Sequence, residues 1–185
     1  MILVIDTSSS LSALAVIGGD DLMFGPREPI PLKAVVADPH EVQKVVIATG
    51  PGSFTGLRRG ASFGVGLAMG LGVPVVPLRT LDLQAARGRG RFTALSEAGR
   101  GRFYFLMPGG SPALGSPADI PRERPLVGLL SDASRILLKE SGHEFANGND
   151  LLTVAAAAEE LLKFAHEVPY GSVKLEYMQS MGAKF

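Results

Sequence analysis

The sequence contains no cysteine, and neither sign of charge is in excess, because Lys plus Arg and Asp plus Glu number 18 each. The absence of cysteine excludes disulfides, thiolate metal sites and a cysteine nucleophile, and it fits a reducing compartment. The balanced charge gives no electrostatic reason to expect general binding of nucleic acid. With 46% hydrophobic and 19% charged residues among 185, the composition is that of a globular protein with one domain or two small lobes.

Motifs that mark several enzyme classes are also missing. The three histidines, His40, His143 and His166, include no i, i+4 pair with an acidic companion, so a zinc or iron site is not predicted. No Gly-x-Ser-x-Gly elbow is present, which leaves a serine hydrolase without support. The glycine-rich turn at residues 50–53 is not followed by Gly-Lys-Ser/Thr, so it is not a P-loop. We expect neither a metal nor a cofactor.

Targeting and membrane signals are equally scarce. Residues 1–6 lack the basic region and the long apolar core of a signal peptide, so we expect a cytoplasmic protein. Residues 60–78 carry no charge over 19 positions, which is the length of a membrane span. Gly72, Pro74 and Pro77 divide this stretch into a helix and a strand, so a soluble domain is favoured.

The most informative stretch runs from residue 48 to residue 72. An apolar strand enters it, a glycine-rich turn follows, and a helix of mostly small residues is predicted over 54–71, with Ser53 or Thr55 as its N-cap and Gly72 as its stop. Amides at the start of a helix attract anions, but glycines at a tight turn are common for structural reasons alone. We favour a structural turn, formed by Gly50, Pro51, Gly52, Ser53 and Gly56.

Small residues recur along one stripe of this helix, at Gly56, Gly60, Gly64 and Ala68. Each glycine costs about 1 kcal/mol relative to alanine inside a helix, so a close contact must compensate. Either the chain's own sheet or a helix of another subunit can provide that contact. Because the helix is apolar nearly all round, we predict that part of it forms a protein–protein interface. The predicted interface residues are Leu57, Gly60, Ala61, Gly64, Leu67, Ala68 and Leu71.

The first half of the chain reads as strands followed by alternating helices and strands. Residues 2–24 have the pattern of three antiparallel strands joined by short turns. A weak helix over 31–38, a strand over 45–49, the helix over 54–71, a strand over 73–77 and a helix over 80–86 follow. The predicted order is βββαβαβα, with crossovers typical of parallel strands.

After the flexible Arg/Gly segment 87–91, the opening pattern returns in weaker form. We expect strands over 92–95, 102–107, 126–130, 143–146 and 173–177, helices over 131–141 and 151–166, and a loop over 108–125. The prediction is therefore an α/β protein with a first lobe at residues 1–90 and a smaller, degenerate second lobe at residues 91–185, each with a mixed sheet flanked by helices.

Two groups of polar residues have both a functional and a structural interpretation. Asp6, Thr7 and Ser8 end the first strand and could form a weak nucleotide site by holding a nucleotide-bound metal, although an Asx or Ser turn is favoured. Arginines gather near the lobe boundary and could contact RNA phosphates, although a solvated face is favoured because aromatic platforms are missing. They are Arg79, Arg87, Arg89, Arg91, Arg100 and Arg102, offset by Asp82 and Glu97.

Several strings of this sequence together resemble the bacterial TsaB (YeaZ) family. The most specific is Gly-Pro-Gly-Ser-Phe-Thr-Gly-Leu-Arg at residues 50–58. It is accompanied by Ile-Leu-Val-Ile-Asp-Thr-Ser at 2–8, Gly-Leu-Ala at 66–68 and Gly-Val-Pro-Val-Val at 72–76. The resemblance covers residues 1 to about 85, and residues 97–104 are similar to the family's second hairpin.

The resemblance implies an actin-like, sugar-kinase-like (ASKHA, RNase H-like) two-lobe fold. It implies a non-catalytic role in forming N6-threonylcarbamoyladenosine in tRNAs that read codons starting with A. The implied partners are the catalytic subunit TsaD, which carries the metal, and the ATPase TsaE, with tRNA reached through the complex. First-lobe helices would form a homodimer and compete for the same surface with TsaD.

One departure from the family and one alternative function remain open. The helix predicted over 31–38 is much shorter than the family's first helix, which normally shares the dimer surface, so a different homodimer geometry or a monomer is expected. The alternative to a partner subunit is a stand-alone nucleotide-dependent enzyme, or a metallopeptidase of the wider glycoprotease family. Nucleotide titration and capture of a TsaD-type protein discriminate between the two.

Overall fold

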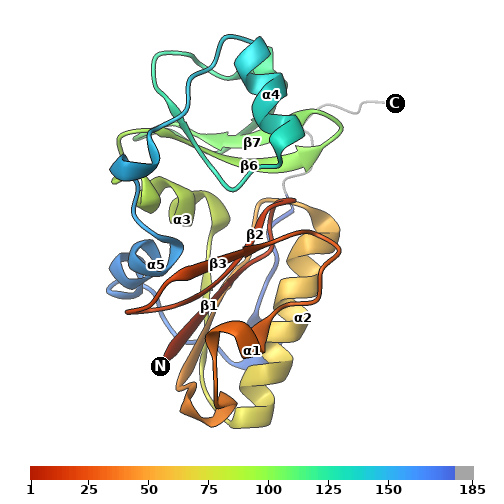
Figure 1. Ribbon diagram of the computed structural model, residues 1–185, viewed down its shortest axis with the longest axis vertical. Coiled ribbons are helices and arrows are strands. Elements are labelled where there is room, and N and C mark those ends of the chain that lie inside the picture. Colours follow the sequence, from red (N-terminus) through yellow and green to blue (C-terminus); the bar gives the residue numbers. More distant parts are fainter. Residues whose placement is uncertain (178–185) are drawn as a thin grey trace.

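Two β-sheets lie one above the other, with helix α3 between them (Figure 1). The computed structural model describes residues 1–177. The first sheet has five strands in the order β3-β2-β1-β4-β5, and the second has four in the order β8-β7-β6-β9. Strands and helices alternate along the chain, which confirms the predicted α/β class.

The first sheet is built as predicted, from an antiparallel meander followed by parallel crossovers. β1 pairs antiparallel with β2 and parallel with β4, and β4 pairs parallel with β5. The order βββαβαβα is confirmed. Its elements are β1 (Ile2–Asp6), β2 (Ser12–Val16), β3 (Asp21–Phe24), α1 (Leu32–Val35), β4 (Lys44–Ala48), α2 (Phe54–Leu71), β5 (Val75–Leu78) and α3 (Thr80–Arg87).

Both faces of the first sheet are covered, because its strands alternate side chains between two apolar clusters. Leu3, Ile5 and Ile47 point to the side of α1 and α2. Val4 and Val46 point to the opposite side, where α5 (Val154–Leu162) packs. Strands buried on both faces have continuous apolar sequences, which is why β1 and β4 were predictable.

The small stripe of α2 contacts the chain's own sheet. Gly60 and Gly64 are buried together with Leu57 and Ala68. A Cβ at Gly60 would collide with the hydroxyl of Thr7, and one at Gly64 would lie 2.8 Å from Cδ1 of Ile47. The glycines of this stripe therefore pack against the chain's own sheet, which was the first of the two contacts considered, and not against a helix of another subunit. As predicted, Ser53 caps the helix with its hydroxyl and Gly72 ends it in a left-handed conformation.

The second sheet is smaller, with α4 packed on one face and α3 on the other. β6 pairs antiparallel with β7 and parallel with β9. The helix α4 begins after Ser131, whose hydroxyl caps it, and packs Leu138 into an apolar cluster with Leu95 and Phe103. The elements are β6 (Thr93–Gly99), β7 (Arg102–Leu106), β8 (Ala113–Gly115), β9 (Leu126–Val127) and α4 (Asp132–Glu140).

The last described segment returns to the first sheet. The carboxylate of Asp21 in β3 accepts hydrogen bonds from the amides of Val154 and Ala155 at the start of α5. Residues after α5 run along the edge strand β5, where Val168 bridges Val75. The division of the chain into lobes between residues 90 and 91 stays a prediction. Although α5 follows residue 91, it packs on the first sheet.

Several predicted elements differ in the structure. The helix expected over 31–38 is a single turn, because the chain is extended at Val36 and turns again at Pro39–Glu41. The loop expected over 108–125 contains β8, and residues 143–146 form only one bridge, between Phe145 and Leu126. The helix expected over 151–166 is limited to Val154–Leu162. Residues 173–177 are not a strand. The amide of Glu176 bonds to the carbonyl of Thr49, which precedes the glycine-rich turn and lies outside the strands.

The inner and outer glycines of α2 should respond oppositely to the same substitution. In Gly64→Leu the new side chain meets Ile47 and Ile5, and such overpacking typically costs about 1–3 kcal/mol. In Gly66→Leu the side chain enters open space, and removing a helical glycine stabilises by up to about 1 kcal/mol. We expect Gly64→Leu to melt several degrees below Gly66→Leu in thermal circular dichroism. Equal melting temperatures would contradict the observed packing of the stripe.

Candidate functional site

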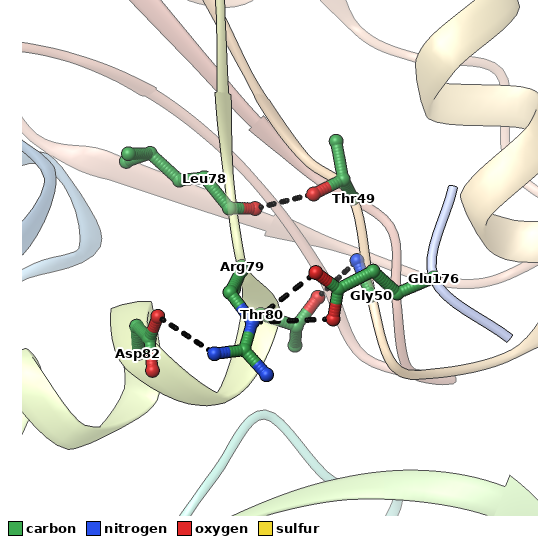
Figure 2. A network of polar contacts seen from close by, with 7 residues as sticks. All are labelled: Thr49, Gly50, Leu78, Arg79, Thr80, Asp82 and Glu176. Carbon is green, nitrogen blue, oxygen red and sulfur yellow. Dashed lines mark hydrogen bonds and ion pairs between the residues drawn. The ribbon is translucent and has the colours of Figure 1, made fainter. Parts of the chain in front are cut away.

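The glycine-rich turn is anchored to the strand and helix beside it. The amide of Gly50 donates a hydrogen bond to Oγ1 of Thr80 at 3.0 Å, and Oγ1 of Thr49 donates to the carbonyl of Leu78 at 3.0 Å (Figure 2). Thr80 begins α3 without capping it, because Arg79 occupies the cap position and the Thr80 hydroxyl accepts the bond from Gly50. The turn is therefore tied to the end of β5.

The C-terminal segment closes over the same turn. The amide of Glu176 donates to the carbonyl of Thr49 at 2.8 Å, and its carboxylate lies 3.2 Å from Nε of Arg79 (Figure 2). Gly50 has a φ of 111°, and a Cβ there would lie 2.5 Å from the carbonyl oxygen of Glu176. Only glycine fits this position. These contacts support the structural interpretation of the turn over an anion site.

Asp6 is buried, and both of its carboxylate oxygens have partners within the chain. Oδ1 accepts from the amide of Ser8 at 3.0 Å and from its hydroxyl at 2.6 Å, and Oδ2 accepts from Nε2 of Gln84 at 3.1 Å. Burial raises the pKa of Asp6 despite these hydrogen bonds and the nearby Arg87. A raised pKa means that the protonated form of Asp6 is more compatible with the folded state than the ionised form. The stability that the protonated form contributes is lost as pH rises through the pKa of the folded state.

Thr7 completes the same strand end from the side of α2. Its hydroxyl donates to the carbonyl of Gly56 at 2.7 Å. Asp6, Thr7 and Ser8 are thus buried at 1% exposure each and bonded to their own surroundings. Their arrangement matches the Asx and Ser turn that was favoured, and the weak nucleotide site stays a prediction.

Glu97 links the two sheets through both its amide and its carboxylate, and sequence reasoning missed this role. Its Oε2 accepts from the amide of Ser10 at 2.7 Å, and its Oε1 accepts from the amide of Ser131 at 2.9 Å and the hydroxyl of Ser131 at 2.7 Å. Burial acts to raise its pKa, but the hydrogen bonds from Ser10 and the 131–134 turn outweigh burial, and the pKa is lowered.

Beside Glu97 lies a hollow of about 250 Å³ between the first and second sheets. The side chain of Phe54 at its rim is 53% exposed. The guanidinium of Arg58 lies 3.8 Å from the centre of that ring, and the ring of Tyr177 lies 5.1 Å away. The lining residues are Ser10, Ser53, Phe54, Thr55, Glu97, Ala98 and Gly99.

The predicted partner interface divides into covered and accessible positions. Leu57, Gly60, Gly64 and Ala68 are buried against the chain's own sheet, so no partner helix reaches them, and their assignment to an interface needs correction. Ala61, Leu67 and Leu71 are half-buried at the margins. An interface elsewhere on this helix stays a prediction. The exposed outer face of α2 is formed by Arg58, Ser62, Gly66, Met69 and Gly70.

The arginines near the lobe boundary do not form one uniform patch. Arg79 pairs with Glu176 and Asp82, and Arg87 turns inward to donate from Nη1 to Oε1 of Gln84 at 2.9 Å. The other four, Arg89, Arg91, Arg100 and Arg102, are exposed. Because Arg79 and Arg87 bond within the chain, the group is better explained as solvent-exposed arginines than as a surface for RNA phosphates.

The three histidines differ in their exposure to solvent. His40 and His166 are exposed, whereas His143 is buried with Nε2 2.8 Å from the carbonyl of Pro117. Among residues 1–177, no group of three or more acidic or histidine side chains is placed to hold a metal ion. No helix within the described chain combines the length and apolar character needed to cross a membrane.

Comparison with protein families and relatives gives matches to one group of proteins. Residues 32–120 match the family model of TsaD, tRNA N6-adenosine threonylcarbamoyltransferase. The tRNA threonylcarbamoyladenosine biosynthesis protein TsaB of Bacillus subtilis is 38% identical over 69 residues, 36% of this chain and 30% of that protein. TsaB of Haemophilus influenzae is 44% identical over 46 residues, 25% of this chain and 20% of that protein. The matched segments thus span less than a third of these relatives.

Solved structures match over nearly the whole length. YeaZ from Pseudomonas aeruginosa has a TM-score of 0.61 at 19% identity, covering 95% of this chain and 99% of that one. A protein described as similar to peptidase YEAZ from Pseudomonas aeruginosa has a TM-score of 0.64 at 19% identity, covering 96% and 99%. These likenesses confirm the two-lobe α/β fold that the sequence strings implied. The chain is thus similar to TsaB (YeaZ) proteins, in sequence over part of its length and in fold over nearly all of it.

Proposed function

We propose that this chain is a non-catalytic subunit of the machinery that forms N6-threonylcarbamoyladenosine in tRNAs reading codons that start with A. It acts by pairing with a TsaD-type catalytic subunit. Support comes from the similarity to TsaB (YeaZ) proteins and from the names of the relatives, which refer to tRNA threonylcarbamoyladenosine biosynthesis. In this proposal a TsaE-type ATPase joins the pair, and tRNA is reached through the complex.

The outer face of α2 is the observation that carries the pairing proposal. The helix has a buried inner stripe and an outer face on which Gly66 and Gly70 have no atom within 4 Å of a Cβ position. Two small residues at this spacing let another helix approach closely. Met69, 58% exposed, adds apolar surface that a partner would cover. We therefore propose the stripe of Ser62, Gly66 and Gly70 as the interface, in place of the buried stripe of Gly60 and Gly64.

The similarity of this chain to the TsaD model supports the choice of partner. Residues 32–120, which match that model, include all of α2. Two related folds can contact each other through the same helix face, as the subunits of a two-fold dimer do. The same reasoning allows a homodimer on the same face when the catalytic subunit is absent. Residues 1–90 are proposed as the partner-binding lobe, on which α5 from the second half of the chain also packs.

The stand-alone enzyme has less support in the described residues. A nucleotide-dependent enzyme of this fold needs an acidic group free to hold a nucleotide-bound metal. Asp6 is the candidate, and both of its oxygens already accept hydrogen bonds from Ser8 and Gln84. Burial also raises its pKa, which makes the charged form that would hold a cation less favourable than it is in water.

Substitution on the outer face of α2 should weaken partner binding without harming the fold. Gly66→Leu fills the open space above the helix, and the overpacking of the interface is expected to cost about 1–3 kcal/mol, or roughly 5- to 150-fold in affinity. The measurement is the dissociation constant for the TsaD-type subunit of the same organism by calorimetry.

Gly148→Leu is the matched control, because Gly148 also has open space at its Cβ position but lies outside the first sheet's helices. The control is expected to bind the TsaD-type subunit like the unchanged protein. Binding of Gly66→Leu at full affinity would argue against an interface on this face.

Asp6→Asn tests the alternative function and the environment of Asp6 together. We expect no saturable binding of Mg²⁺ and ATP in calorimetry by either the unchanged protein or the variant. Because the pKa of Asp6 is raised, only the unchanged protein should lose stability on ionisation. Its melting temperature, relative to Asp6→Asn, should therefore fall as pH rises from 4 toward 7. Tight ATP binding that Asp6→Asn abolishes would instead support the enzyme.

A further inference from the structure

The carboxylate of Glu97 joins three parts of the chain that are distant in sequence. Glu97 lies in β6, Ser10 follows β1, and Ser131 caps α4. Ser10 and Ser131 donate to different oxygens of the one carboxylate. The backbone amide of Glu97 in turn donates to the hydroxyl of Ser9 at 3.1 Å. The bonds to Ser9 and Ser10 cross from the second sheet to the first. The bond from the Ser10 amide to the carboxylate is charge-assisted, and such bonds are stronger than neutral ones.

The chain crosses between the sheets twice, and the two crossings lie side by side. The amide of Leu152 donates to the carbonyl of Arg87 at 2.8 Å, and Nε of Arg87 donates to the carbonyl of Leu152 at 3.3 Å. The first crossing contains Arg89 and Gly90 at positive φ, 52° and 67°. Paired crossings with such residues have the form of a hinge, in which a few loop positions absorb a change of φ and ψ.

The surface between the crossings and Glu97 is apolar. Leu81 of α3 packs against Ala94 of β6 and Val127 of β9. Apolar packing has no preferred direction, so it resists separation of the sheets more than rotation of one over the other. Directional bonds across this surface are therefore needed to set the angle, and Glu97 supplies them.

We propose that Glu97 is a latch that holds the two lobes in one relative orientation, against rotation about the crossings at residues 87–92 and 147–153. The latch also shapes the hollow beside it, because Glu97 and Ser10 line that hollow together with Ser53 at the start of α2. Release of the carboxylate would open the hollow and free the turn after β1. The side chain of Glu97 thus adds a charge-assisted bond between the lobes to the hydroxyl contact of Ser9 with Ser96 at 3.3 Å.

Spin-label distance measurements test this latch, and the absence of cysteine lets two labels be placed without background. Lys33→Cys in α1 and Lys139→Cys in α4 put exposed labels on the two lobes. We expect one narrow distance distribution in the otherwise unchanged chain. Adding Glu97→Ala should broaden the distribution or shift it. Hydrogen exchange of the Ser10 amide should rise at least tenfold, while the Leu152 amide at the crossing keeps its protection.

Asp119→Ala is the matched control, because Asp119 also accepts bonds from the amide and hydroxyl of a serine, Ser116, but within one lobe. It should leave the distribution narrow. Glu97→Gln keeps the side-chain shape and tests the latch where Glu97→Ala fails to fold. We expect it to broaden the distance distribution less than Glu97→Ala does. A distribution as narrow as in the unchanged chain, in Glu97→Gln and in any folded Glu97→Ala, would overturn the latch.

Discussion

The close contact between α2 and the first sheet is the constraint on which the rest of the structure depends. Gly60 approaches Thr7 so closely that a Cβ has no room, and Gly64 approaches Ile47 in the same way. This contact brings the start of α2 against the end of β1, where the hydroxyl of Thr7 bonds to the carbonyl of Gly56. The glycine-rich turn before α2 must then be tight, and the opposite face of the helix is left to solvent.

Local sequence patterns predicted most of the first sheet because the signals are short-range. β1 and β4 are continuous apolar runs, and the beginning and end of α2 are marked by Ser53 and Gly72. The stripe of small residues correctly indicated a close contact. The contacting surface could not be chosen from spacing alone, because a sheet and a partner helix require the same small residues. Only the fold shows that the sheet takes the inner stripe.

The parts that escaped prediction depend on partners far away in the sequence. Glu97 is one acidic residue in a short strand, and nothing near it indicates that Ser10 and Ser131 converge on it. Residues 173–177 were expected to form a strand, but their contacts are a single amide bonded to the carbonyl of Thr49 and the carboxylate of Glu176 beside Arg79. Such contacts have no periodic signature, so sequence patterns do not report them.

Asp6 and Glu97 show how burial alone does not determine the role of a carboxylate. Asp6 is fully enclosed, and desolvation outweighs its hydrogen bonds, so its pKa is raised. Glu97 is less enclosed, and its hydrogen bonds outweigh desolvation, so its pKa is lowered. Hydrogen bonds to a charged carboxylate are stronger than those to a neutral group, and Glu97 makes its bonds between distant parts of the chain. The strand end that resembles a nucleotide site is therefore suited to packing, and the acidic residue of the weaker lobe is suited to joining the two halves.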